Sequence, residues 1–296
     1  MELFNNSKVL KQTETLPSLP ATVTNVMAVI ANPESSGDDL VNAILPDQAM
    51  CATILKIANS AFFGIPREVA SMDKAVNVLG FNEVYNIVLG KAVFNSFQKI
   101  NKENKKVIDA FWQHAFHCGL TAKIIAEDLK CPPSELFIAG LIHDIGKLIF
   151  FMSQPSSYLP ILEMENIGYF LNCSEAEQHQ FNVDHGTVGL HLLTRWMFPE
   201  RLLNAVGYHH YPENCNNNTL YAIIVQLSDA LSVLVTQDPP VKITQLYTQV
   251  TILLPKSKEL WEQHKLSIDD QQIQKWASAL QASIEKDSAI LSAFSS

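Results

Sequence analysis

Two polar residues stand at the centre of an otherwise apolar segment, and their chemistry suits a metal ion. His143 and Asp144 lie between Ala139 and Phe150, a stretch that we expect to be helical. An imidazole and a carboxylate are costly to bury among aliphatic side chains unless a partner satisfies them. A divalent metal satisfies both groups at once. Further ligands elsewhere in the chain would therefore indicate a metal site.

Other candidate ligands occur on the neighbouring predicted helices. Asp229 is the only charged residue between Leu220 and Thr236. A bare carboxylate in such surroundings is costly or becomes protonated. A structural ion pair is the alternative, but few Arg or Lys residues lie nearby, which favours a metal. The candidate metal ligands are His114, His143, Asp144, His185, His209, His210 and Asp229.

Several histidines and one aspartate also have simpler explanations. A single histidine on an apolar helix face is more often a hydrogen-bonded core residue than a ligand, and we assign that role to His117. His209 and His210 could instead form a polar helix end, where cationic side chains interact favourably with the dipole. Asp184 is expected to cap the helix that follows it. The metal hypothesis depends on the combination of residues rather than on any one of them.

Lys147 lies on the same predicted helix face as His143 and Asp144, because it follows them by four and three residues. It could pair with Asp144 or extend its charged end to solvent. It could also contact a phosphate held at a metal centre. The residues alone leave these roles open.

The spacing of apolar residues predicts an all-α fold, because helical periodicity recurs throughout and sustained period-two alternation is missing. We expect a bundle of short helices over residues 1–98, a second helical block over 99–240 and a helical extension over 241–296. The polar stretch 99–106 is the expected junction between the first two. In the second block, one helix is predicted over Glu135–Met152 and another over Ser174–Gln180, with Ser174 and Glu177 matching a capping box.

Composition narrows the class of protein and its location. The 296 residues are 47% hydrophobic and carry a net charge of −9 without a basic cluster, which argues against nucleic-acid binding. The five cysteines form no CxxC pair, as expected for reduced thiols in the cytoplasm. The N-terminus lacks a signal-peptide pattern, and the longest apolar run, Leu220–Val235, is too short to span a bilayer. We therefore predict a cytoplasmic protein without a membrane partner.

The ordered ligand series resembles the HD superfamily of metal-dependent phosphohydrolases, and the chain is more specifically similar to HDOD proteins, the HD-related output domains of bacterial signalling. The similarity covers about residues 10–235, in which an N-terminal set of motifs precedes the HD-like set. The motifs are Leu16-Pro-Ser-Leu-Pro20, Ile54-Leu-Lys-Ile-Ala-Asn-Ser-Ala-Phe-Phe-Gly64, Ala75-Val-Asn-Val-Leu-Gly80, Trp112-Gln-His114, Gly140-Leu-Ile-His-Asp-Ile-Gly146 and Asp184-His-Gly-Thr-Val-Gly189.

The resemblance implies two groups of ligands. One ion would be held by His114, His143, Asp144 and Asp229. A second would be held by His185, His209 and His210, with Asp144 bridging the two ions. Lys147 matches the lysine that meets substrate phosphate in related hydrolases. The chain lacks the Gly-Tyr-Pro element of the relatives that cleave cyclic dinucleotides, because His209 and His210 are followed by Tyr-Pro-Glu213.

Two functions follow as expectations. HDOD domains are regarded as regulatory, so the first is a signal-transduction protein with a retained metal site, a protein partner and a phosphate-containing or nucleotide ligand. Its partner surface could include Phe62-Phe-Gly-Ile65, although these aromatics also fit ordinary core packing. The second is a phosphohydrolase in which Asp144 orients the attacking water and Lys147 holds phosphate oxygens. Imidazole and carboxylate ligands suit one or two ions of Fe, Mn, Ni, Zn or Mg, and they do not select among them.

Overall fold

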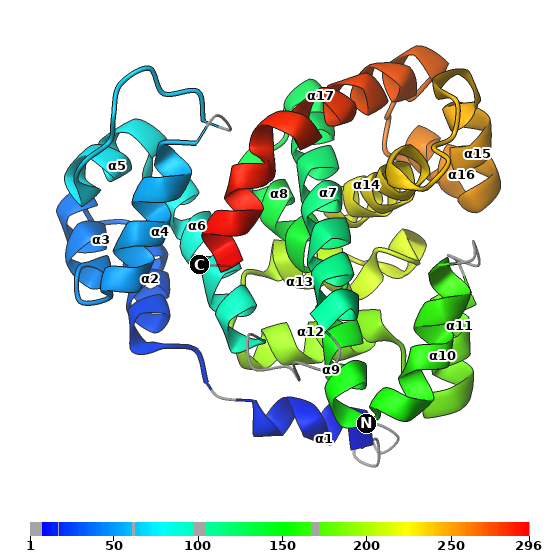
Figure 1. The fold of residues 1–296 in the computed structure, drawn as a ribbon, viewed down its shortest axis with the longest axis horizontal. Helices are drawn as coiled ribbons and strands as arrows, with labels where there is room; N and C mark the ends of the chain where they lie inside the picture. The colour runs from blue at the N-terminus through cyan, green and yellow to red at the C-terminus, as the bar shows by residue number, and fades with distance from the viewer. Residues whose placement is uncertain (1–7, 17, 61–62, 98–104, 167–171, 296) are drawn as a thin grey trace. The chain divides into compact units, whose positions relative to one another are not determined.

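The computed structural model describes residues 8–16, 18–60, 63–97, 105–166 and 172–295, and these residues form helices and no strand (Figure 1). This confirms the all-α prediction. The chain divides into two compact units, the first made of Met1–Pro17 with His114–Leu280 and the second of Ser18–Gln113 with Gln281–Ser296. Two of these divisions fall inside the continuous helices α7 (Lys105–Leu129) and α17 (Asp270–Ser295). The division into three parts near residues 98 and 240 stays a prediction.

The second unit contains short helices whose starts are fixed by side-chain caps. Ser36 and Asp39 form a reciprocal capping box at the first of two neighbouring helices, and Asp47 accepts a hydrogen bond of 2.9 Å from the Met50 N–H at the other. The helices of this unit are α2 (Ala21–Ala31), α3 (Gly37–Ile44), α4 (Gln48–Ala58), α5 (Met72–Leu79) and α6 (Phe81–Ser96).

Asn59 fixes the connection between α4 and α5. Its side-chain amide accepts a hydrogen bond of 2.8 Å from the Val69 N–H and donates one of 2.9 Å to the Val69 carbonyl. Of the aromatic pair proposed as a partner surface, Phe62 lies outside the described residues and Phe63 is half-buried. The partner surface stays a prediction.

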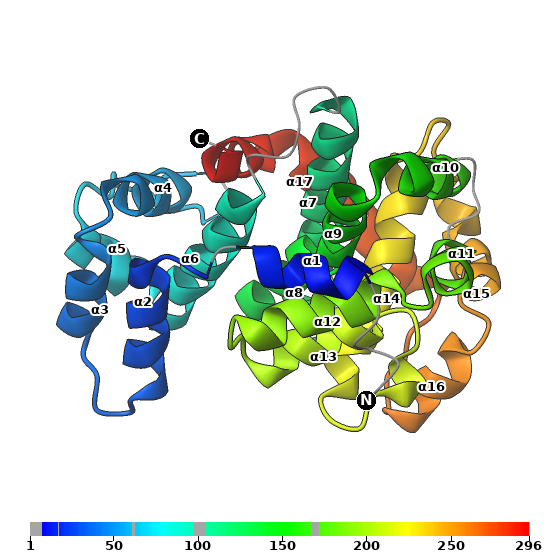
Figure 2. The same cartoon turned by 90° about the horizontal axis from the view of Figure 1, so that it is seen from below.

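The first unit carries every candidate ligand. Around α14 (Thr219–Thr236), helices α8 (Pro133–Ile142) and α13 (Glu200–Tyr208) pack against one another and against it, and α12 (His185–Arg195) packs between α13 and α9 (Ile145–Ser153). Figure 2 shows α1 beside α9 and α12, where the Arg195 guanidinium donates to the Thr13 and Leu16 carbonyls. The remaining helices are α1 (Lys8–Thr15), α10 (Pro155–Asn166), α11 (Asn172–Phe181), α15 (Leu246–Leu253) and α16 (Ser257–Gln263).

The predicted helix over Glu135–Met152 is wrong in one respect that matters for the site. It is broken between α8 and α9, where His143 ends α8 and Asp144 precedes α9 with φ −95° and ψ 10°. The two residues thus lie at a two-residue break between helices, called here the α8–α9 corner, rather than inside one continuous helix. The break frees both side chains from helical spacing and lets them point into the same space.

Glycines allow the helices beside this corner to approach closely. A Cβ on Gly140 of α8 would lie 2.8 Å from Cα of Gly119 on α7, and a Cβ on Gly146 would lie 2.0 Å from the carbonyl oxygen of His185. Neither position leaves space for any side chain. These contacts set the distances between the helices that carry His114, His143, Asp144 and His185.

Two apolar stretches of the described residues, Pro133–Ser153 and Thr219–Thr236, are long and apolar enough to cross a membrane by length and composition. The expectation that the run Leu220–Val235 is too short is therefore wrong. In the first stretch, 89% of the apolar window is buried inside the fold, and in the second 72%. Both also carry buried charged groups, among them Asp144, Lys147 and Asp229. Mostly buried core helices pass the same test.

The C-terminal segment, residues 241–296, contacts other helices of the first unit through α15 and the beginning of α17. α15 contacts α14, and on α17 the side chains of Lys275 and Trp276 donate hydrogen bonds to Asp128 of α7. Trp276 is fully buried. Further along α17, in the second unit, the Phe294 carbonyl accepts a hydrogen bond of 2.8 Å from the buried Lys91 ammonium.

Candidate metal centre

Three candidate ligands from α7, the α8–α9 corner and α14 form a first set. Nε2 of His114 and Nε2 of His143 lie 3.1 Å and 3.5 Å from Oδ1 of Asp229. His143 and Asp229 are buried, and 23% of the His114 side chain is exposed. One ligand atom from each residue can therefore reach a common point.

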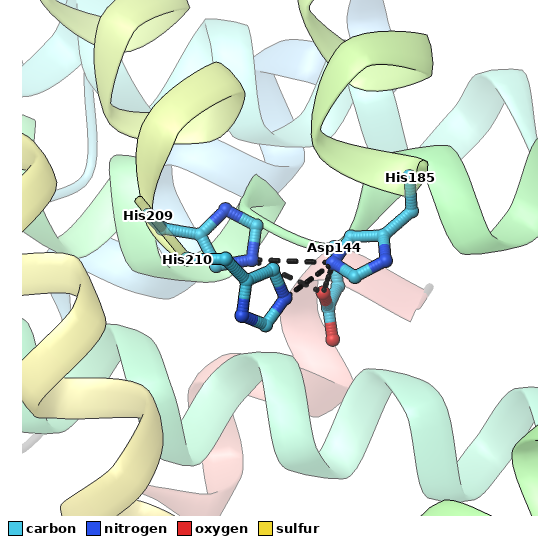
Figure 3. Close-up of side chains that lie close together, drawn as sticks. All are labelled: Asp144, His185, His209 and His210. Atoms are coloured by element: carbon cyan, nitrogen blue, oxygen red, sulfur yellow. Dashed lines mark hydrogen bonds and ion pairs between the residues drawn. The ribbon is translucent and has the colours of Figure 1, made fainter. Parts of the chain in front are cut away.

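A second set is formed by three histidines and Asp144, as Figure 3 shows. Nε2 of His185 lies 2.8 Å from Nε2 of His210 and 3.3 Å from Nε2 of His209. His185 begins α12, while His209 and His210 follow α13 directly. Two helix ends thus bring three imidazoles together around one carboxylate.

Asp144 belongs to both sets, because its two oxygens face in different directions. Oδ2 lies 3.3 Å from Nε2 of His143 in the first set. Oδ1 lies 3.1 Å from Nε2 of His185 in the second. A carboxylate placed in this way can bridge two cations, one on each oxygen.

Hydrogen bonds fix the ring orientation of three imidazoles. Nδ1 of His143 lies 2.7 Å from the Gly140 carbonyl, and Nδ1 of His209 lies 2.8 Å from the Val206 carbonyl. Nδ1 of His185 lies 2.7 Å from a Glu177 carboxylate oxygen. Because these oxygens can only accept, each Nδ1 carries the proton. Nε2 is the nitrogen that each ring turns toward the site, which is the arrangement that outer hydrogen bonds give to metal-ligating histidines.

The donor atoms fit a divalent metal in two independent ways. First, Nε2 of His114 and of His143, Oδ1 of Asp144 and Oδ1 of Asp229 are buried and make no hydrogen bond. Second, two ligands about 2.1 Å from one ion are about 3.0 Å apart at an octahedral angle and about 3.4 Å apart at a tetrahedral one. Several donor pairs have spacings near these values, among them His114–Asp229 at 3.1 Å, His185–Asp144 at 3.1 Å and His185–His209 at 3.3 Å. Buried polar atoms without partners are costly, so the atoms of the two sets are better suited to binding cations than to packing in an apolar core.

The electrostatics of the two sets favour an ionised Asp144, a neutral His209 and, without a metal, a protonated His185. Burial raises the pKa of Asp144, but the His143 and Lys147 charges outweigh it and hold that pKa well below its usual range. The pKa of His209 is lowered to about 3, first by burial and then by the charges of His143 and His185. For His185, burial lowers the pKa, whereas Glu177 and Asp144 together raise it to about 10.

Lys147 lies against the centre rather than in solvent. Its ammonium is 2.8 Å from Oδ2 of Asp144, and only 5% of its side chain is exposed. The pairing role considered from sequence is thus present. His117 lies outside both sets, buried in the core, with its pKa lowered to about 4 by burial and by the charge of His114.

The predicted cap at Asp184 is confirmed, because its carboxylate accepts a hydrogen bond of 2.7 Å from the Thr187 N–H. The predicted capping box of Ser174 and Glu177 is wrong. α11 begins earlier, at Asn172, and the Glu177 carboxylate instead bonds to His185. The sequence carried one usable signal, since Glu177 shares a helix face with Cys173 and Phe181 at intervals of four and so points toward the core.

Two of the candidate ligands are partly exposed to solvent, namely His114 and His210. The other five are buried: His143, Asp144, His185, His209 and Asp229.

Comparisons with known proteins agree with this architecture. The chain matches the HDOD domain family over residues 16–212. An uncharacterized protein of Treponema pallidum is 24% identical over 209 residues, which cover 69% of this chain and 39% of that protein. The chain thus spans well under half the length of this curated relative.

Two solved structures share the fold at low sequence identity. A proposed phosphohydrolase of Shewanella amazonensis SB2B has a TM-score of 0.76 at 20% identity, covering 98% of this chain and 99% of its own. A proposed signal transduction protein of Marinobacter aquaeolei VT8 has a TM-score of 0.71 at 21% identity, covering 95% of this chain and 60% of its own. Since the family match extends over well more than half of the residues, the chain belongs to the HDOD domain family.

Proposed function

We propose that this HDOD protein is a cytoplasmic signal-transduction protein whose first unit binds two divalent metal ions. The observation that carries the proposal is the convergence of imidazole nitrogens and carboxylate oxygens on two points beside Asp144, where four of these atoms are buried and make no hydrogen bond. His114, His143 and Asp229 would hold one ion. His185, His209 and His210 would hold the other.

The way in which the donor set is assembled favours a regulatory centre. The donor set is assembled from five separate segments, so that ligand binding ties α7, α12, α13, α14 and the α8–α9 corner together. Binding free energy in such a site becomes folding free energy for the segments it joins. The order of these helices would then depend on what occupies the site, and a protein partner in a signalling pathway would respond to that order.

A phosphohydrolase is the second candidate, and Lys147 is the observation that supports it. A buried ammonium beside Asp144, at a centre with two partly exposed ligands, could hold the oxygens of a phosphoester or nucleotide. Bound divalent ions at such a site lower the pKa of a water and offset negative charge on phosphate. Asp144 would orient the water, and Lys147 would turn from Asp144 to the phosphate.

Elemental analysis of protein purified without a metal-affinity step tests the metal centre. We expect between one and two equivalents of Fe, Mn, Ni, Zn or Mg in the wild type and at least a tenfold loss in His143→Ala and Asp144→Ala. His264→Ala is the matched control, because His264 is an exposed histidine of the first unit. Less than about 0.2 equivalents in the wild type, unchanged in the two site variants, would contradict the proposal.

A panel of phosphoesters and nucleotides with added Mn, Fe, Ni or Mg separates the two candidates. Turnover that disappears in Asp144→Ala and falls in Lys147→Met would support the hydrolase. Metal-loaded protein without turnover, together with a protein captured by the wild type and released by Asp144→Ala, would support the regulatory function. Turnover that survives in Asp144→Ala would identify a contaminating enzyme.

A further inference from the structure

Glu177 is a fully buried carboxylate beside the second set of ligands. Its Oε2 accepts two hydrogen bonds of 2.7 Å from His185, one from the backbone N–H and one from Nδ1 of the ring. Its Oε1 accepts a hydrogen bond of 2.6 Å from the Tyr158 hydroxyl and one of 3.5 Å from the Cys173 thiol. Both oxygens of this carboxylate are therefore engaged.

We propose that Glu177 is the positioning residue of the second metal ion, acting through His185; this rests on the metal centre proposed above. By binding the backbone and the ring of one residue at once, Glu177 fixes both the start of α12 and the rotation of the imidazole. Because Glu177 engages Nδ1 as a proton donor, Nε2 is the ring nitrogen left to bind a metal ion, and it faces Oδ1 of Asp144 at 3.1 Å. A negative charge behind the ring also makes Nε2 a stronger donor.

Cys173, Glu177 and His185 also lie close enough to form a metal set of their own. Their hydrogen bonds favour the positioning role instead. The groups facing the Glu177 oxygens are a backbone N–H, a ring N–H, a hydroxyl and the Cys173 thiol, all of which bring protons. The bare acceptors of this region are elsewhere, on Asp144 and Asp229.

The structure also holds Glu177 itself in place, as a positioning residue requires. The ring of Tyr158 stacks on Phe150 at a centroid distance of 5.0 Å and an angle of 14°, and Phe181 lies 5.0 Å from the same phenylalanine. Phe150 belongs to α9, the helix that begins after Asp144. The aromatic group thus joins α10 and α11, which hold Glu177, to the helix next to the bridging carboxylate.

Titration of the full chain with Co²⁺, followed by calorimetry and visible absorbance, tests this role. We expect two bound ions in the wild type, and in Glu177→Gln a 10- to 100-fold weaker affinity for one ion with the other unchanged. Glutamine keeps the size and one acceptor oxygen while removing the charge. Asp128→Asn is the matched control, since it neutralises a hydrogen-bonded carboxylate of the first unit outside both ligand sets and should leave both affinities unchanged.

The outcomes separate this inference from the function on which it rests. Two ions of wild-type affinity in folded Glu177→Gln overturn the positioning role and leave the metal centre standing. A wild type that binds no Co²⁺ overturns the centre itself and the inference with it. If Glu177 had a purely structural role, Glu177→Gln would lower the melting temperature without selectively weakening the binding of one ion.

The position of the His185 ring proton gives a second test that requires no stable variant of Glu177. A long-range ¹H–¹⁵N spectrum of wild-type protein without added metal should show His185 protonated at Nδ1. The His185 ring signals are assigned by their disappearance from the spectrum of His185→Gln. His185 protonated at Nε2 alone would overturn the proposal.

Discussion

Replacing Gly146 by alanine should separate two helices that the metal centre needs in contact. The new Cβ would lie 2.0 Å from the carbonyl oxygen of His185 and 2.8 Å from its carbonyl carbon. Real Cβ atoms essentially never come closer than 3.0 Å to another heavy atom. The first turns of α9 and α12 must therefore move apart by about 1 Å, because the contacting atoms are backbone and no side chain can rotate away.

This displacement exceeds what metal coordination tolerates. Ligand distances in metal sites hold to about ±0.2 Å, whereas Gly146→Ala would move His185 by about 1 Å relative to Oδ1 of Asp144. We expect at least a tenfold loss of affinity for one of two Co²⁺ ions. Overpacking should also lower the free energy of unfolding by about 1–3 kcal/mol.

Urea unfolding of chelator-treated protein measures the second effect, and Co²⁺ titration measures the first. Gly37→Ala is the control, because its Cβ would meet Cγ1 of Val76 at 3.5 Å, an ordinary contact. That variant should bind both ions normally and be stabilised by up to about 1 kcal/mol. If Gly146→Ala unfolds at the same urea concentration as wild type and binds both ions equally well, the reasoning is refuted.

Three further predictions concern other parts of the first unit. Asp229→Asn should lower the affinity for one of the two Co²⁺ ions at least tenfold, because Asp229 is the carboxylate that belongs to the first set alone. An unchanged calorimetric titration would contradict this. Asp128 accepts hydrogen bonds from Lys275 and Trp276 that lower its pKa. Because the folded pKa is the lower one, the stabilisation is present above about pH 4 and is lost as the pH falls through the folded value. Urea unfolding of wild type and Asp128→Asn should thus differ at pH 7 and the difference should shrink as the pH falls below the ordinary aspartate range, and a constant difference would count against it. Gly140→Ala should cost about 1–3 kcal/mol, since its Cβ would lie 2.8 Å from Cα of Gly119, and an unaltered melting temperature would show that α7 and α8 can separate.

The sequence allowed most of the candidate ligands to be singled out, because their types are unusual where they stand. A carboxylate such as Asp229 within an aliphatic helix is rarely left without a partner, so its position alone pointed to a site. Helical periodicity located α14 and the Asp184 cap closely enough to show that a carboxylate such as Asp229 does not match its aliphatic surroundings. The grouping of the ligands into two sets came from family resemblance, because spacing along a chain does not show which helices meet.

The corner between His143 and Asp144 could not be predicted from local pattern. The apolar sequence on both sides is continuous and contains no proline, so periodicity alone favours one helix. Tertiary contacts decide the matter, since Gly146 must lie against the backbone of His185. Asp144 can then turn one oxygen toward each set.

Glu177 was misinterpreted for a related reason. A serine and a glutamate three residues apart match a capping box by type, but a cap requires the serine to stand just before the helix. Here α11 already includes Ser174, and the glutamate faces inward to His185. The partner of a buried carboxylate depends on the packing of α10, α11 and α12 together, which a local motif does not contain.

A crystal structure of Co²⁺-loaded protein, with anomalous difference maps recorded on either side of the cobalt edge, tests the metal centre most directly. We predict two peaks beside Asp144, one about 2.0–2.2 Å from Nε2 of His143 and the other at the same distance from Nε2 of His185. Maps without a peak within about 3 Å of either Asp144 oxygen would contradict the account.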